Sequence, residues 1–349
     1  MPKAEERAGT KRMLFLSLAL GMGLIGIAVW IARPGAILAR MGTLGAGGIA
    51  ALVLNFVIGF SCGVEGWRWL LRAQGIRAPF SSAFRIMSGG YALGYSIPSC
   101  YLAGEPVRAL WASREFSAPG HKVVAAIVLE KVLLAAGTAA ILFWAGAVGL
   151  RGGFPSTLRQ GVFSLAGAAA FIAGATLVGS TRRTPWALRC LAFAQRFLPR
   201  WAFLERGNEA LLEVKSALQK ALSGHREAVA KAAGFIALMF CLNALAPLIF
   251  FALAYGRVLS AEELAVFLAL GNLSSLLFWL TPGGIGVAEG AYVGIFKIMD
   301  LPIDGAVTFA LAQRIASLPI VALGFFYLSR QGVSELWRWR HDKVGSNSF

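Results

Sequence analysis

The sequence predicts an all-α polytopic membrane protein with about six full transmembrane helices and two re-entrant broken-helix hairpins, arranged as two inverted-topology repeats. Three observations lead to this fold class. First, 57% of the 349 residues are hydrophobic and only 14% are charged, which favours an integral membrane protein. Second, apolar runs recur at the length of about 20 residues that a helix needs to cross a bilayer. Third, one pattern of polar residues occurs twice. We therefore expect a single integral membrane domain over residues 1–349.

Uninterrupted apolar runs give the full transmembrane helices. They occupy residues 13–32, 43–61, 123–149, 160–180, 229–255 and 306–329. The first run has no small-residue cleavage site after it, so we expect a retained helix rather than a signal peptide. Residues 181–231 carry ten Lys or Arg against four Glu, and both tails also have excess base. The positive-inside rule then predicts a multi-pass protein with both termini in the cytoplasm.

Two further apolar runs, at 79–116 and 262–299, are interrupted by proline and glycine. Proline removes a backbone donor and clashes with the preceding helical turn, while glycine tolerates dihedrals that other residues avoid. Non-helical backbone at membrane depth needs protein or a water-filled cavity around it. Both runs are therefore predicted to be re-entrant hairpins. The residues expected to form the structural breaks are Pro98, Gly104, Pro282, Gly283, Gly284 and Gly286.

The interrupted runs share one spacing of polar residues. In each, a proline precedes a glutamate by seven residues, and another charged residue follows that glutamate by twenty-five. The first set is Pro98, Glu105 and Glu130, and the second is Pro282, Glu289 and Arg314, with the last member of each set in the apolar run that follows. The offset of 184 residues between the runs also brings the neighbouring apolar segments into register, which predicts an internal repeat.

The repeat divides the domain into four parts. They are repeat one at 43–149, an inverting helix at 160–180, a cytoplasmic interfacial segment at 181–228 and repeat two at 229–330. Inverted repeats with broken helices are typical of secondary transporters, which bind their substrate where the repeats meet.

The interfacial segment has two parts. Residues 182–201 mix arginines with tryptophan and phenylalanine, as a helix on the membrane surface does. Residues 203–222 place one apolar face on a helix, made of Leu204, Leu211, Val214, Leu218 and Leu222. The segment is either a linker that lies on the lipid headgroups or a surface that gathers anionic lipids.

Six charged residues near the breaks are the candidates for substrate binding: Glu105, Arg108, Glu130, Lys131, Glu289 and Arg314. A charge near the bilayer centre costs roughly 2.5 to 3.5 kcal/mol on insertion scales, so such residues are usually functional. Three acids and three bases form a balanced set that can survive burial. The alternative is a structural salt-bridge network. We favour a polar cavity in which bases hold phosphate and a carboxylate holds an amine or a coupling proton.

Several classes of site are missing from the sequence. No aspartate precedes Asp300, the three histidines are scattered, and no His, Cys or carboxylate cluster has metal-binding spacing. Neither a Gly-x-Ser-x-Gly elbow nor a Walker loop occurs. We therefore expect no catalytic residues, no metal and no cofactor, and we expect that the protein is not an enzyme. The net charge of +16 follows from basic loops, so nucleic acid is not an expected partner.

These motifs resemble the flippase-like family that includes the transmembrane region of lysylphosphatidylglycerol synthases, hopanoid-associated proteins and uncharacterised bacterial inner-membrane proteins. The resemblance covers about 13–330 and is most specific at Pro282-Gly-Gly-Ile-Gly-Val-Ala-Glu289, then at Gly104-Glu105-x-x-Arg108. The family's usual Glu-Arg pair in the following helix is here Glu130-Lys131, and lysine cannot bind phosphate in the bidentate manner of arginine. The lipid headgroup that this chain prefers can therefore differ from the one preferred by family members with the Glu-Arg pair.

The resemblance implies a flippase of the bacterial inner membrane that moves a lipid between leaflets, in the best-known members an aminoacylated phosphatidylglycerol. We expect a phospholipid or a related lipid, such as an aminoacylated phosphatidylglycerol, a hopanoid or a polyprenyl lipid, to pass through a midplane polar cavity. The expected partners are membrane lipids with anionic or aminoacylated headgroups, lipid-synthesis enzymes and a second copy of the chain. A membrane-embedded lipid-linked transferase, a small-solute secondary transporter and a scaffold for lipid-synthesis enzymes are the alternatives.

Overall fold

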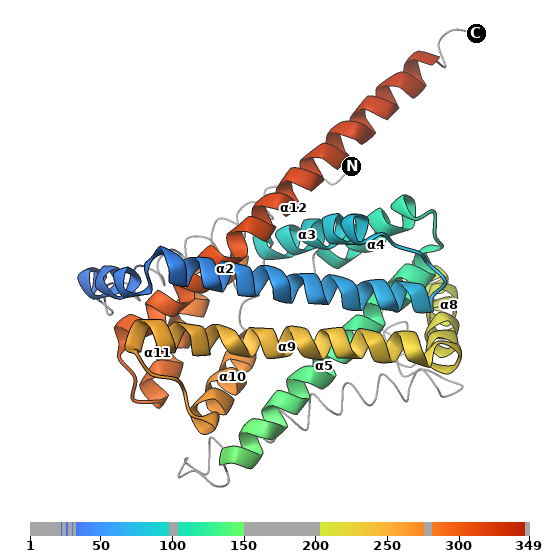
Figure 1. Ribbon diagram of the computed structural model, residues 1–349. Helices are drawn as coiled ribbons and strands as arrows, with labels where there is room; N and C mark the ends of the chain where they lie inside the picture. The colour runs from blue at the N-terminus through green and yellow to red at the C-terminus, as the bar shows by residue number, and fades with distance from the viewer. Residues whose placement is uncertain are drawn as a thin grey trace.

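The computed structural model describes residues 22, 26, 30, 33–97, 104–149, 203–275 and 281–345, and these residues form helices without any strand (Figure 1). Pro98 and the expected inverting helix at 160–180 lie outside the described residues, as does most of the expected span at 13–32. The all-α fold class is confirmed for the part that is described.

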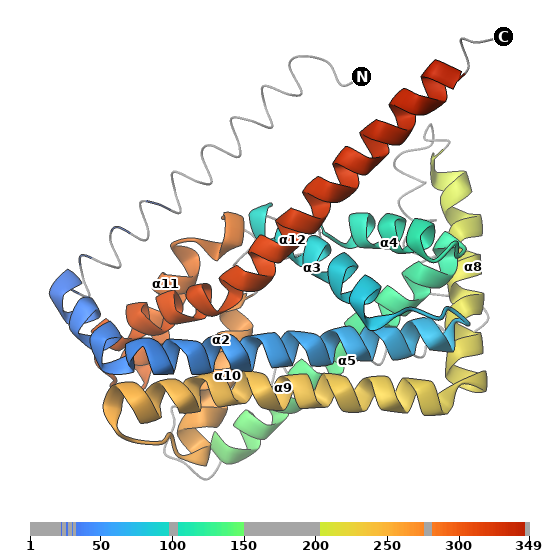
Figure 2. The same ribbon diagram turned by 45° about the horizontal axis from the view of Figure 1, so that its top comes forward.

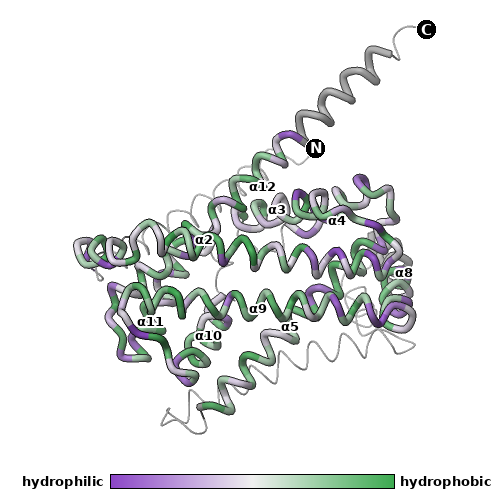
Figure 3. Tube along the Cα trace, viewed as in Figure 1, coloured by the Kyte–Doolittle hydropathy of each residue, from purple (hydrophilic) through white to green (hydrophobic). Residues whose placement is uncertain are grey.

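Four helices are long and apolar enough to cross a membrane. They are α2 (Pro34–Ala73), α5 (Gly120–Gly149), α9 (Arg226–Tyr255) and α12 (Ile303–Gly345), the last up to Arg330. Each covers one of the predicted apolar runs. An apolar run in lipid is helical because a helix satisfies its backbone polar groups internally. The prediction of a membrane protein is confirmed, and the hydropathy along these helices is visible in Figure 3.

Shorter helices occupy the two interrupted runs. The first run contains α3 (Phe80–Ser96) and α4 (Gly104–Glu115). The second contains α10 (Ala261–Ser275), the 3₁₀ turn η2 (Pro282–Gly284) and α11 (Val287–Ile298). Another helix, α8 (Phe203–Gly224), precedes α9.

The second break is built from glycines with positive φ. Gly283, Gly284 and Gly286 have φ of 60°, 62° and 80°, values that side chains with a Cβ rarely adopt. Thr281 before them is extended, and α11 starts directly after Gly286. The helical structure is therefore interrupted at Pro282–Gly286, the segment in which the sequence contains proline and three glycines. In the first run, α3 ends at the extended Ile97 and α4 begins at the predicted Gly104.

The long helices α2 and α9 lie side by side and antiparallel (Figures 1 and 2). Near the start of α2, Arg40 Nη1 donates to the Ala254 carbonyl at the end of α9, 2.8 Å away. Near the end of α2, the Lys231 ammonium at the start of α9 lies 4.6 Å from the ring centroid of Trp69. This pair forms the centre of the molecule.

The order of helices in the first part recurs in the second. The series α2, α3, α4, α5 corresponds to α9, α10, α11, α12, and the contacts are paired in the same way. Helix α12 packs on α3 and α2, while α5 packs on α10 and α9. Elements far apart in sequence therefore enclose the same central region.

Two apolar clusters stabilise this arrangement. One surrounds Trp67 and includes residues of α4, α5 and the α8 residue Leu218, so the predicted apolar face of α8 packs on the helix bundle. The other is aromatic and centres on Phe250, Phe267 and Phe309, whose rings meet edge to face.

Candidate functional site

The first group of predicted charges forms a chain of ion pairs between α4 and α5. Arg108 donates to Glu105 at 3.2 Å and also to Glu130, and Lys131 pairs with the other oxygen of Glu105. Glu105 and Arg108 meet because they are one turn apart on α4. Two acids and two bases make the group neutral.

This first group runs from the surface into the interior. The Lys131 side chain is 41% exposed and Glu105 19%, whereas Arg108 and Glu130 are 3% and 5% exposed. The Arg108 guanidinium lies 4.0 Å from the ring centroid of Trp67, a cation–π contact. The buried Nε of Arg108 and Nε1 of Trp67 have no acceptor among the described residues. Arg108 is thus a buried cation with unused hydrogen-bonding capacity.

The second group joins Glu289 of α11 to Arg314 of α12. Arg314 Nε lies 2.6 Å from one carboxylate oxygen of Glu289, and Nη2 lies 3.1 Å from the other. This bidentate geometry is the strongest that arginine makes with a carboxylate. Glu289 is fully buried, and it also accepts the Gly286 N–H at 2.7 Å. The carboxylate therefore holds both Arg314 and the start of α11 in place.

Arg314 also connects the second break to the first half of the chain. Its remaining N–H groups donate to the Tyr95 hydroxyl at 3.1 Å and to the carbonyls of Gly283 and Gly284 at 3.0 and 3.1 Å. A guanidinium has five N–H donors, and all five are used here. The Tyr95 ring packs so closely on Gly283 that a Cβ there would lie 2.8 Å from it.

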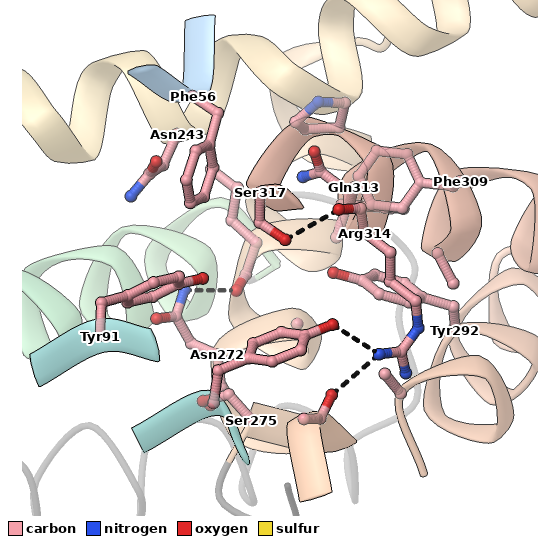
Figure 4. A pocket seen from close by; sticks show the side chains of 18 residues that line it. Phe56, Tyr91, Asn243, Asn272, Ser275, Tyr292, Phe309, Gln313, Arg314 and Ser317 are labelled. Atoms are coloured by element: carbon pink, nitrogen blue, oxygen red, sulfur yellow. Dashed lines mark hydrogen bonds between the residues drawn. The ribbon is translucent and has the colours of Figure 1, made fainter. Parts of the chain in front are cut away.

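A cavity of about 290 Å³ opens next to Arg314, between elements of both halves. Its wall combines aromatic rings with polar groups, and Arg314 is its charged residue. Its polar side chains include Tyr95, Asn243, Asn272, Ser275, Gln313 and Ser317. They come from α3, α9, α10 and α12, and Figure 4 shows several of them around the same space. A mixed wall of this kind suits a small polar ligand.

The six predicted charges occupy two places rather than one. Arg314 alone among them lines the cavity, and no ion pair joins the two groups within the described part of the chain. Helix α3 lies against both groups, because Gly90 packs on Arg108 and Tyr95 accepts a hydrogen bond from Arg314. Their role in substrate binding remains a prediction.

Tyr95, Asn243 and Asn272 line the cavity but were not among the predicted site residues. The two asparagines carried a usable signal, because amide side chains are uncommon inside apolar runs such as 229–255. Tyr95 carried none, since tyrosine is common near membrane interfaces. Within the described residues, no group of three or more His, Cys, Asp or Glu could hold a metal ion.

A comparison with protein-family models matches residues 14–324 to the one described as the lysylphosphatidylglycerol synthase TM region. The match covers most of the chain and confirms the family resemblance of the motifs. Searches among curated proteins and among solved structures found no match.

Proposed function

The chain belongs to the family of the lysylphosphatidylglycerol synthase TM region, and from this premise we propose that it is a lipid flippase of the bacterial inner membrane. Its substrate is a phospholipid or related lipid with an anionic or aminoacylated headgroup. The observation that carries the proposal is the polar cavity beside Arg314, which both halves of the chain enclose.

The size and chemistry of the cavity suit a headgroup. Small-molecule sites usually measure about 300 to 1,000 Å³, so a volume of about 290 Å³ accepts a headgroup but not two acyl chains. The acyl chains then stay in the surrounding lipid. The amide groups of Asn243 and Asn272 are suited to hydrogen bonds with headgroup oxygens, whereas the Ser317 hydroxyl already donates to the Arg314 carbonyl.

The arrangement of helices supports two repeats of inverted topology. Corresponding helices α2 and α9 are antiparallel, as a two-fold axis in the membrane plane requires. In this proposal α3–α4 and α10–α11 are re-entrant hairpins, the expected helices at 13–32 and 160–180 complete six spans, and both termini are cytoplasmic. Rocking of one repeat against the other would open the cavity to each leaflet in turn.

Arg314 is the proposed phosphate ligand. All of its donors are occupied, so a phosphate can bind only by replacing an acceptor. The Tyr95 hydroxyl and the two glycine carbonyls are neutral acceptors, which form weaker hydrogen bonds than an ionised phosphate does. Glu289 keeps the guanidinium oriented during this exchange. The Lys131–Glu105–Arg108–Glu130 chain lies outside the wall of this cavity, and in this proposal it is a second polar site for the headgroup, reached from the surface through Lys131 and Glu105.

Headgroup exchange between leaflets tests this proposal. Purified protein is placed in phosphatidylcholine vesicles with headgroup-labelled phosphatidylglycerol, and a membrane-impermeant reductant bleaches the outer leaflet. Active protein exposes label from the inner leaflet as well, whereas empty vesicles keep about half of it. Folded Glu289→Gln protein is expected to behave like empty vesicles. Equal bleaching with wild-type and empty vesicles, for both phosphatidylglycerol and its lysyl ester, would refute the flippase assignment.

A small-solute secondary transporter is the second candidate, and the small cavity volume favours it. Uptake of a labelled amino acid into vesicles, together with an absence of lipid exchange, would support this alternative. No observation on the described residues favours a lipid-linked transferase.

A further inference from the structure

A second, strongly basic pocket lies where α2 ends and turns into α3. Its volume is about 190 Å³, and its wall includes Arg68, Arg72 and Arg77 with only one acid, Glu65. The pocket therefore has a net charge of +2. This basic pocket is distinct from the cavity beside Arg314. Along α2, Phe56 lines that cavity, and the chain continues through Trp67 before it forms the basic pocket.

The arginines of this pocket differ in how they are neutralised. Arg68 forms an ion pair with Glu65, and its Nε donates to the Ala78 carbonyl at 2.9 Å. These bonds hold Arg68 against the turn. Arg72 and Arg77 are exposed, and no ion pair joins either of them to a carboxylate in the described parts of the chain. Two cations therefore remain available to an anion from outside.

The aromatic residues around the pocket indicate that it lies at the membrane surface. Trp69 lies in its wall, with the Arg72 guanidinium 4.9 Å and the Lys231 ammonium 4.6 Å from the ring centroid. Phe80 is exposed beside Arg68. Aromatic and basic residues at the end of a membrane-crossing helix are typical of the headgroup layer. Figure 3 shows hydrophilic residues at this end of α2 and at the adjacent start of α9.

We propose that this pocket binds the phosphodiester headgroup of an anionic membrane lipid, at a site separate from the transport cavity. Arg72 and Arg77 contact the phosphate oxygens, since guanidinium groups match phosphate geometry with paired N–H donors. Trp69 lies against the glycerol region of the lipid. A free phosphate ion shares this chemistry, but the exposed Phe80 ring and the position at the end of α2 favour a lipid.

Lipid retention measures this binding without requiring transport. The full-length protein is reconstituted in nanodiscs of phosphatidylcholine with a minor share of phosphatidylglycerol, extracted in mild detergent and analysed by native mass spectrometry. Wild-type protein is expected to keep phosphatidylglycerol, and the double variant Arg72→Gln with Arg77→Gln to bind it at least about tenfold more weakly. The same loss of phosphatidylglycerol binding is expected when Arg72→Gln and Arg77→Gln are added to a protein that carries Arg314→Lys, in which the cavity is altered.

The matched control is Arg226→Gln, which removes an exposed arginine at the start of α9 outside the pocket wall. Its phosphatidylglycerol binding is expected to equal that of wild type, and size-exclusion profiles check that all variants are folded. Equal retention by the double variant and wild type, or equal loss in the Arg226→Gln control, would overturn the site. Displacement of the lipid by excess inorganic phosphate would assign the pocket to a free ion and overturn the lipid assignment.

Discussion

Arg314 shows how a single side chain can serve both structure and function. It makes five hydrogen bonds that link α11, the glycine break and α3. Removing one partner of a buried ion pair usually costs about 3 to 5 kcal/mol, because the other charge remains buried without compensation. Arg314 and Glu289 therefore stabilise the site as a unit, and a test of function needs a conservative substitution.

Arg314→Lys is that substitution. Lysine keeps the charge but has neither the planar fork nor the reach to two carbonyls, so lipid exchange is expected to fall at least about tenfold, with moderately lower stability. Arg330→Lys, at an exposed position of the same helix, is the control and should leave both properties unchanged. Exchange rates and thermal unfolding in detergent measure the two effects. Wild-type exchange in Arg314→Lys would exclude Arg314 as the phosphate ligand.

Tyr95→Phe separates the hydroxyl from the ring. The ring can still pack on Gly283, but Arg314 loses one neutral acceptor, so unfolding should become easier by about 1 kcal/mol. Lipid exchange should persist, because in the proposed mechanism a phosphate oxygen replaces the Tyr95 hydroxyl as an acceptor of Arg314. A loss of exchange as complete as that expected of Arg314→Lys would show that the hydroxyl is required for substrate binding rather than replaced by it.

At the scale of elements, the close approach of α3 and α4 depends on glycine. A Cβ on Gly104 would lie 1.9 Å from the Gly90 carbonyl oxygen, so these helices touch backbone to backbone. Small residues permit such approach between membrane helices, where packing rather than hydrophobicity drives association. The contact positions Glu105 and Arg108, which follow Gly104 on the same helix.

Gly104→Ala is therefore expected to destabilise the protein by about 1 to 3 kcal/mol through overpacking. The control is Gly234→Ala in α9, where a Cβ would meet nothing within 4 Å. That change should stabilise the helix slightly, since alanine is the better helix former. Thermal unfolding of both variants in one detergent gives the comparison. Equal melting temperatures for Gly104→Ala and wild type would contradict the observed helix packing.

The sequence predicted local features better than distant contacts. Proline and glycine at Pro282–Gly286 act within a few residues, and the break occurs there as predicted. The pairing of Glu105 with Arg108 follows from helical spacing. The contact of Tyr95 with Arg314 joins residues 219 apart, and no periodic pattern encodes it. For the same reason, sequence reasoning could not assign the six charges to two separate groups.

In the molecule as a whole, helices of both halves line one cavity, with α2 and α3 from the first half and α9 to α12 from the second. The helix contacts that pair α3 with α12 also pair α10 with α5. These contacts join the two halves, so a movement of one half against the other would rearrange them. The central claim is that a lipid headgroup occupies this cavity and binds Arg314.

An electron cryomicroscopy structure in nanodiscs containing phosphatidylglycerol and its lysyl ester tests that claim most directly. We expect headgroup density in the cavity, with a phosphate oxygen within hydrogen-bond distance of Arg314 and the Tyr95 bond to that arginine broken. Headgroups found only outside the cavity, with all five Arg314 hydrogen bonds intact, would contradict the account.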